Sequence, residues 1–198
     1  MKKKRLLYIV VIVLLILGGT GIWSFKKFNF NRDFFIGEPL DSLNGVVVYY
    51  NGGVNHVLER NMTEEGYNLG LKYQCVEFVK RYYYQHLCHK MPDSYGHAKD
   101  FFDSTLSDGV KNEKRDLIQY INPSCTPPQI NDLIIFEGTV FNRYGHVAIV
   151  SNVTAHEIEI IQQNPGPYAK SREIYPLIHK EDQWIIDNDR VLGWLRKE

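Results

Sequence analysis

The sequence predicts an α+β domain that follows a single apolar helix. Three patterns indicate this: an uncharged run of 18 residues near the N-terminus, a helical pattern at about Gln74–Leu87, and a series of strand-like segments from residue 132 onward. Helices followed by a run of antiparallel strands are typical of α+β proteins. At 198 residues, the chain is long enough to bury one core of ordinary size.

The apolar run from Leu6 to Trp23 follows four basic residues, and as a helix it would span about 27 Å, close to the thickness of a bilayer's hydrocarbon core. A cleaved signal peptide and an uncleaved signal anchor are the two competing interpretations. No A-x-A cleavage pattern follows the run, and Trp23 stands where an interfacial aromatic residue would stand, so we expect an anchor. Residues 1–25 are then a single-pass transmembrane helix, residues 26–44 a tether, and residues 45–198 a folded domain outside the cytoplasm.

The charge distribution argues against a nucleic-acid partner. No acidic residue precedes Asp33, and without the six basic residues from Lys2 to Lys27, 17 basic residues face 23 acidic ones. Nucleic-acid-binding domains carry a basic patch or stripe, and the folded part of this chain is acidic. The expected partners are therefore a peptide or amide substrate and, through the N-terminal helix, a membrane.

The predicted elements of the domain follow from periodicity. The helix at Gln74–Leu87 has an apolar stripe that includes Cys75, with Glu77, Lys80 and Arg81 on the opposite face. A short second helix is expected after Pro92, and Ser124–Gln129 reads as a loop. Strands are expected at Gly45–Tyr50, Asp132–Gly138, Gly145–Val153, Ile158–Asn164 and Arg190–Leu195. The segment Gly145–Val153 is apolar on both faces, which is typical of a central strand.

Cys75 and His146 are the candidate nucleophile and base. A free cysteine is most often a small buried residue, so alone Cys75 indicates little. In the first turn of a helix, however, the helix dipole favours its thiolate, and its own N–H is free to bind an oxyanion. A thiol nucleophile needs a base that is distant in sequence, and His146 opens the central strand directly after Gly145.

A polar group that orients the imidazole would complete the site. The strand Ile158–Asn164 ends in "QQN", where period-2 alternation places Gln162 and Asn164 on one face and Gln163 on the other. Either side chain on that face can accept the imidazole N–H. Solvation of a strand end is the competing explanation for this polar cluster.

These segments, "QCVEFVKRYY", "GHVAIVSNV" and "IEIIQQN", with a closing "VLGW", resemble in order and spacing the CHAP family of cysteine- and histidine-dependent amidohydrolases and peptidases. The amidase domain of glutathionylspermidine synthetase/amidase is especially similar. The resemblance covers about residues 45–196 and implies a papain-like fold of the NlpC/P60 type, with N-terminal helices packed on an antiparallel sheet. It implies Cys75 as nucleophile and His146 as base.

Two positions depart from the family pattern. The family's third residue is commonly the Glu of an E-Q-N sequence, and Gln162 stands there, followed by the matching Gln163 and Asn164. A neutral amide holds the imidazole but stabilises an imidazolium less than a carboxylate does, so Asn164 is a second candidate for this role. Asn131 stands where the family often has Gly before the strand that starts at Asp132.

The implied reaction is acyl transfer from an amide to Cys75, followed by hydrolysis of the thioester, with Gln74 as a supporting oxyanion donor. No metal or cofactor is required. The substrate stays open between a peptidoglycan peptide and a glutathionylspermidine-like amide, and a catalytically weak binding module is the alternative that is not an enzyme.

The other cysteine and histidine patterns carry no such chemistry. The cluster His86, Cys88 and His89 fits no zinc-ligand spacing. A Cys88–Cys125 disulfide is compatible with an extracytoplasmic domain, and the sequence leaves it open.

Overall fold

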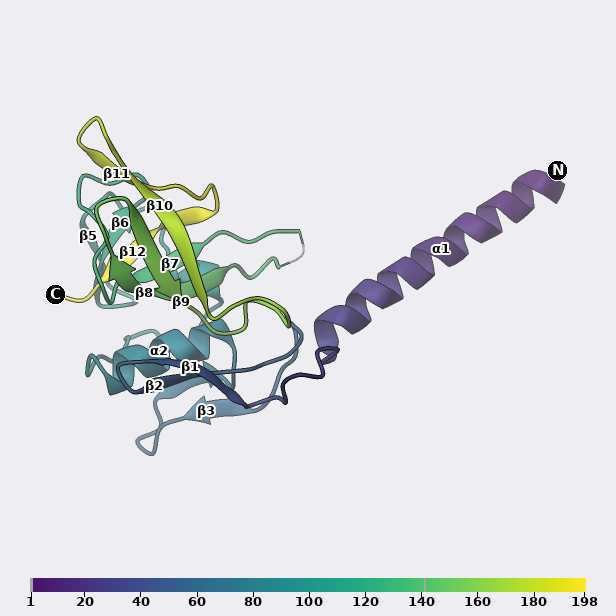
Figure 1. Cartoon of the computed structure of the whole chain (residues 1–198), viewed down its shortest axis with the longest axis horizontal. Coiled ribbons are helices and arrows are strands. Elements are labelled where there is room, and N and C mark those ends of the chain that lie inside the picture. The colour runs from purple at the N-terminus through teal and green to yellow at the C-terminus, as the bar shows by residue number, and fades with distance from the viewer. Residues whose placement is uncertain (1, 141) are drawn as a thin grey trace.

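The computed structural model describes residues 2–140 and 142–198. Helix α1 (Lys2–Lys27) projects away from a compact body that holds the other elements (Figure 1). Within the described residues, Lys4–Lys27 is the one helix long and apolar enough to cross a membrane, with a mean hydropathy of 2.5 and no buried residue in its most apolar window. The predicted anchor lies within α1 apart from Met1, which is outside the described residues. A membrane span and a signal sequence share these properties.

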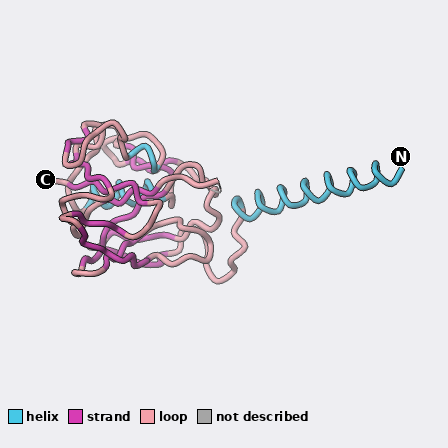
Figure 2. The backbone as a smooth tube through the Cα atoms, turned by 90° about the horizontal axis from the view of Figure 1, so that it is seen from above, coloured by secondary structure: helices cyan, strands magenta, loops and turns pink. Residues whose placement is uncertain are grey.

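The body is built around one antiparallel sheet of eight strands, in the order β11-β10-β9-β8-β7-β12-β6-β5. Two further hairpins, β1–β2 and β3–β4, form separate two-stranded sheets. Seen from above, α1 reaches the body at an end formed by loops and not at the large sheet (Figure 2). The elements before the large sheet are β1 (Pro39–Leu43), β2 (Val46–Tyr49), β3 (Arg60–Met62), β4 (Asn68–Leu71), α2 (Cys75–Gln85) and the 3-10 helix η1 (Ala98–Phe101). Its strands are β5 (Val110–Asn112), β6 (Leu117–Ile121), β7 (Leu133–Phe136), β8 (His146–Val153), β9 (Glu157–Ile161), β10 (Arg172–Lys180), β11 (Gln183–Ile186) and β12 (Val191–Arg196).

The predicted α+β class with antiparallel sheets is confirmed, and α2, β2, β7, β8, β9 and β12 fall on the predicted segments. The strands that sequence patterns missed are short or polar, as β3, β5 and the largely exposed β10 illustrate. The predicted second helix is the single 3-10 turn η1. The segment predicted to be a tether, residues 26–44, contains β1, which pairs with β2 and whose Asp41 forms an ion pair with Arg172 of β10.

The central strands bury both faces. On β7 and β8, Ile135 and Val147 belong to the core beneath α2, whereas Ile134 and Ala148 belong to a second core on the opposite face of the sheet. This explains why the sequence of β8 is apolar without alternation. In Figure 1, α2 lies between the large sheet and the small β1–β2 and β3–β4 hairpins.

Because α2 lies between the sheet and the hairpins, its polar face is buried and not exposed to solvent as the amphipathic pattern suggests. Glu77, Lys80 and Arg81 are buried although they lie opposite the apolar stripe. Neighbouring hairpins cover them and supply partners: Asn61 of β3 donates to Glu77, and Lys80 donates to the carbonyl of Asn68 in β4. Buried charges need such partners, because an unpaired one is costly.

The departure at Asn131 has a backbone explanation. Its φ is +77°, in the left-handed region that glycine adopts freely and that asparagine tolerates better than most residues. The Asn131 side chain also accepts a hydrogen bond of 2.6 Å from the Tyr82 hydroxyl of α2. Asparagine therefore replaces glycine here without disturbing the entry into β7.

Candidate active site

Cys75 is the first residue of α2 and its side chain is buried against the start of β8. Gln74 precedes it in extended backbone and makes no side-chain cap, so the first N–H groups of the helix stay available. The backbone N–H groups of Val147, Val76 and Cys75 surround the sulfur and favour its thiolate. Burial outweighs them and raises the pKa of Cys75 to about 11.

His146 opens β8 one residue before Val147, whose backbone N–H bonds the sulfur, and it lines the same cavity as Cys75. Gly145, just before it, lets β7 and η1 pack closely at this point: a Cβ there would lie 2.6 Å from the carbonyl oxygen of Phe136 and 2.9 Å from Cβ of Lys99. The imidazole packs near the Phe136 ring, at 5.9 Å between centroids. Burial lowers the pKa of His146 to about 4, partly offset by its hydrogen bond to Gln162. Near neutral pH the pair is therefore an uncharged thiol beside an uncharged imidazole.

Gln162 follows the last residue of β9 and bonds to the imidazole. Its Oε1 lies 2.9 Å from Nε2 of His146. Its Nε2 lies 3.2 Å from the carbonyl oxygen of Lys170 and 3.3 Å from Oε2 of Glu173. With Nε2 of His146 bonded to Gln162, the other ring nitrogen, Nδ1, is left for the cysteine side.

Asn164, the second candidate for orienting His146, bonds elsewhere. Its Nδ2 donates to the Val54 carbonyl at 3.0 Å and to Oε1 of Gln74 at 2.8 Å. Gln74 in turn donates to the His56 carbonyl at 2.6 Å. Asn164 has a φ of +59°, so the chain turns sharply as it leaves β9. The structure thus connects Asn164 to Gln74 and Gln162 to His146.

A buried polar network that the sequence did not point to lies behind Cys75. Gln163 donates to the Gln74 carbonyl at 3.0 Å and to Oε2 of Glu77 at 2.9 Å, and it accepts from the Tyr49 backbone N–H at 2.8 Å. Glu77 forms a 2.7 Å ion pair with Arg81. The sequence feature that could have indicated this network is the period-2 alternation of the strand, which puts Gln163 on the face opposite Gln162 and therefore toward α2.

Two cavities meet at His146. One of about 540 Å³ is lined by Cys75, His146, Gln74 and Asn164, together with Tyr95 and Tyr144. The other, of about 860 Å³, is lined by His146 and Gln162 but not by Cys75. It extends past Lys170 and Arg190 to the end of α1 at Gly21–Lys26. A substrate carbonyl that reaches the sulfur must enter the first cavity.

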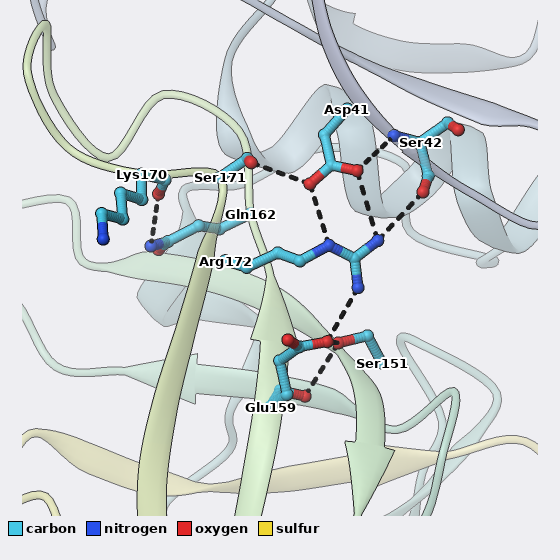
Figure 3. A network of polar contacts seen from close by, with 8 residues as sticks. All are labelled: Asp41, Ser42, Ser151, Glu159, Gln162, Lys170, Ser171 and Arg172. Carbon is cyan, nitrogen blue, oxygen red and sulfur yellow. Dashed lines mark hydrogen bonds and ion pairs between the residues drawn. The ribbon is translucent and has the colours of Figure 1, made fainter.

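An ion-pair network fixes the β10 segment that contacts Gln162 (Figure 3). Arg172 bonds to Asp41 at 2.9 Å and to Glu159 at 2.8 Å, and Ser171 donates to Asp41 at 2.8 Å. The Lys170 carbonyl, just before this cluster, points at the Gln162 amide. Strand β1 thereby holds the start of β10 against β9.

The remaining cysteines lie outside the site. Cys88 and Cys125 are both free and exposed. Among residues 2–140 and 142–198, no group of three or more His, Cys, Asp or Glu side chains is arranged to hold a metal ion.

Comparison with known proteins identifies the family of the chain. The CHAP domain family model matches residues 66–164. Glutathionylspermidine synthase from Crithidia fasciculata is 28% identical over 138 residues, which are 64% of this chain and 19% of that protein. The bifunctional glutathionylspermidine synthetase/amidase of Escherichia coli K12 is also 28% identical over 138 residues, 64% of this chain and 22% of that protein.

The chain thus spans about a fifth of the length of these curated relatives. Among solved structures, the crystal structure of Ly7917 matches 38% of this chain and 30% of its own, with 23% identity and a TM-score of 0.27. The family match runs from the β3–β4 hairpin to the polar end of β9 and includes Cys75, His146 and Gln162. The chain belongs to the CHAP domain family.

Proposed function

We propose that this protein is a cysteine-dependent amidohydrolase with Cys75 as nucleophile and His146 as general base. The observation that carries the proposal is that both side chains line one cavity, while the far nitrogen of the imidazole is bonded to Gln162. A helix N-terminal cysteine on a layer of antiparallel strands is also the papain-like arrangement. Membership in a family of amidohydrolases and peptidases supports the same chemistry.

In this mechanism Nδ1 of His146 removes the thiol proton as the sulfur attacks the amide carbonyl. Because burial disfavours both charged forms at rest, proton transfer accompanies attack and does not precede it. The backbone N–H of Cys75 stabilises the oxyanion, and the second N–H of the Gln74 amide is a further donor. The imidazolium then protonates the departing amine, and water attacks the thioester with His146 again as base.

We propose a peptidoglycan peptide as the substrate. The apolar helix α1, whether it is retained as an anchor or removed as a signal sequence, directs the domain out of the cytoplasm, where cell-wall peptides lie. The second candidate is a glutathionylspermidine-like amide, which the names of the relatives favour.

The test uses the full chain in detergent micelles, incubated separately with purified sacculi and with glutathionylspermidine, and measures newly freed amines. Cys75→Ala and His146→Ala should abolish amine release, and Cys88→Ala, which removes an exposed thiol outside the site, should not. Release from sacculi alone supports the cell-wall substrate, and release from glutathionylspermidine supports the second candidate. Release from neither favours a binding module and contradicts the proposal.

A further inference from the structure

The third residue of the site is an amide, and an amide has two different ends. A carboxylate can only accept the imidazole N–H, so it selects one histidine tautomer in either orientation. A glutamine selects that tautomer when its oxygen faces the ring. Turned over, it would donate to Nε2 of His146 and leave the proton on Nδ1, where the base must be free. Gln162 therefore needs a device that fixes which end faces His146.

The surroundings of Gln162 contain such a device. The amide nitrogen lies between two acceptors, the Lys170 carbonyl at 3.2 Å and Oε2 of Glu173 at 3.3 Å. The amide has two N–H groups, and each has an acceptor in this orientation. Turned over, the amide oxygen would face a carbonyl oxygen and a carboxylate, and the amide would exchange two acceptors for one, Nε2 of His146. Gln162 is 4% exposed, so water does not readily replace them.

The two acceptors differ in how they are held. The Lys170 carbonyl is part of the backbone beside the Asp41–Arg172 cluster (Figure 3). Glu173 lies on β10, and its carboxylate also accepts a hydrogen bond from the hydroxyl of Tyr175, whose pKa is raised by burial and by this bond. Tyr175 packs on Phe136, the ring beside His146, at 5.9 Å. The exposed Glu173 side chain thus has two donors beside the site, the Gln162 amide and the Tyr175 hydroxyl.

We propose that Glu173 is a positioning residue that fixes the Gln162 amide with its oxygen toward His146 and thereby selects the imidazole tautomer that serves as base. The inference rests on the proposed function for its catalytic consequence, but the tautomer itself is a property of the resting protein. The Glu173 carboxylate also supplies a negative charge of the kind that a glutamate at position 162 would carry. It contacts His146 only through the Gln162 amide.

The charged and titratable groups around the ring agree with this role. Burial is the main cause of the lowered pKa of His146, and the hydrogen bond to Gln162 opposes it; Arg190, ahead of β12, lowers the pKa further, and the charge of Glu173 on β10 raises it. Cys75 of α2 lines the same cavity as His146, and burial raises the pKa of its thiol to about 11, so it is uncharged near neutral pH. Glu173 is therefore the carboxylate whose charge favours an imidazolium at His146, against the opposing charge of Arg190.

The experiment compares Glu173→Leu, Glu173→Gln, Gln162→Glu and the exchange Gln162→Glu/Glu173→Gln in the full chain in detergent micelles. Glu173→Leu should lower kcat about tenfold, because the amide is then free to turn over. Glu173→Gln keeps an acceptor oxygen and should lose about threefold or less. Gln162→Glu sets two carboxylates against each other, and the exchange should recover at least about tenfold over that single variant.

The readout that does not need turnover is the nitrogen NMR spectrum of the histidine rings, with His146 assigned by its loss in His146→Asn. The wild type should show His146 protonated at Nε2, and Glu173→Leu should show a mixture of both tautomers. Glu157→Leu, which removes an exposed carboxylate from the adjacent strand β9, is the matched control and should leave the spectrum unchanged.

The outcomes separate the two proposals. An unchanged His146 tautomer in Glu173→Leu overturns this inference, whether or not the protein is an enzyme. A changed tautomer in a protein that hydrolyses neither substrate supports the inference and contradicts the proposed function. An exchange variant no better than Gln162→Glu also counts against Glu173 as the orienting group.

Discussion

The two halves of the site are built differently. On the side of the proposed nucleophile, Gln163 is completely buried and Glu77 is 2% exposed, and together they connect α2, β2 and the end of β9 through several hydrogen bonds and an ion pair. On the side of the proposed base, His146 is half-buried and bonds to Gln162, which donates in turn to the Lys170 carbonyl and to the exposed Glu173.

We expect this difference to place residues that matter for stability on the side of Cys75 and residues that matter for catalysis on the side of His146. The nucleophile side lies between the large sheet and the small hairpins, where each polar group must be paired to be buried at all. The base side lies at strand ends beside two cavities, where little of the core depends on it. Substitutions behind Cys75 are therefore expected to act on folding, and substitutions behind His146 on the chemical step.

Glu77→Ala should have the largest effect. It leaves the buried Arg81 guanidinium without its carboxylate, and removing one partner of a buried ion pair costs about 3–5 kcal/mol of the free energy of unfolding. Denaturant unfolding of the full chain in detergent would measure it. Glu59→Ala, which removes the exposed ion pair with Lys72, is the control and should leave that free energy unchanged. Equal effects of the two variants would contradict a buried network.

Gln163→Leu should come next, at about 3 kcal/mol, because the Tyr49 N–H and the Gln74 carbonyl lose a partner in a buried place. Leucine has nearly the same volume, so the loss reports polar contacts and not a cavity. A decrease below about 1 kcal/mol by the same unfolding measurement would mean that the network is not what holds the start of α2.

Gln162→Leu, one residue away, should reverse this pattern. The imidazole loses its orienting acceptor, and kcat for amide hydrolysis should fall about 30-fold, whereas the free energy of unfolding should change by about 1 kcal/mol. Both are measured on the same preparation. If Gln162→Leu lowered the free energy of unfolding as much as Gln163→Leu does and kept its kcat, the proposed difference between the two sides of the site would be wrong.

Sequence patterns were sufficient for the elements that carry a strong periodic signal. The apolar stripe of α2 and the two-sided apolarity of β8 both reflect burial that the structure confirms. The class of the domain and the family followed from these segments. The spacing of "QQN" also sent Gln163 and Gln162 to different sides, as the structure shows.

The rest depended on contacts between segments that are distant in sequence. No local pattern indicates that Glu77 and Arg81 are buried, because the hairpins that cover them supply the partners. Likewise Asn164 bonds to Gln74 and not to the imidazole, which follows from a left-handed turn after β9. The place of Glu173 beside Gln162 could not be predicted, because β10 is polar and no sequence pattern indicates that it pairs with β9.

The acid limb of the pH profile tests the uncharged resting pair. Burial lowers the pKa of His146 to about 4, so kcat/KM should fall with a midpoint near 4 and not near 6.5 as pH decreases. Since the folded pKa lies below the unfolded one, the unfolded chain binds the proton first, and stability should decrease as pH falls from 6.5 to 4. A preformed thiolate–imidazolium pair would instead keep iodoacetamide alkylation of Cys75 fast and constant across acidic pH.

Asn164→Asp should have the smallest effect and probes the junction between the two sides. The new carboxylate would face the Val54 carbonyl and Oε1 of Gln74, both acceptors, in place of the amide that donates to them. Gln74 would lose one of its anchors, so we expect about a fivefold increase in KM or decrease in kcat, equivalent to about 1 kcal/mol, with the His146 tautomer unchanged. Asn164→Gly, which keeps the left-handed backbone and removes the donor, is the matched control and should fall between the variant and the wild type. A changed tautomer in Asn164→Asp would mean that Asn164 does reach the imidazole, and the separation of the two sides would fail at this residue.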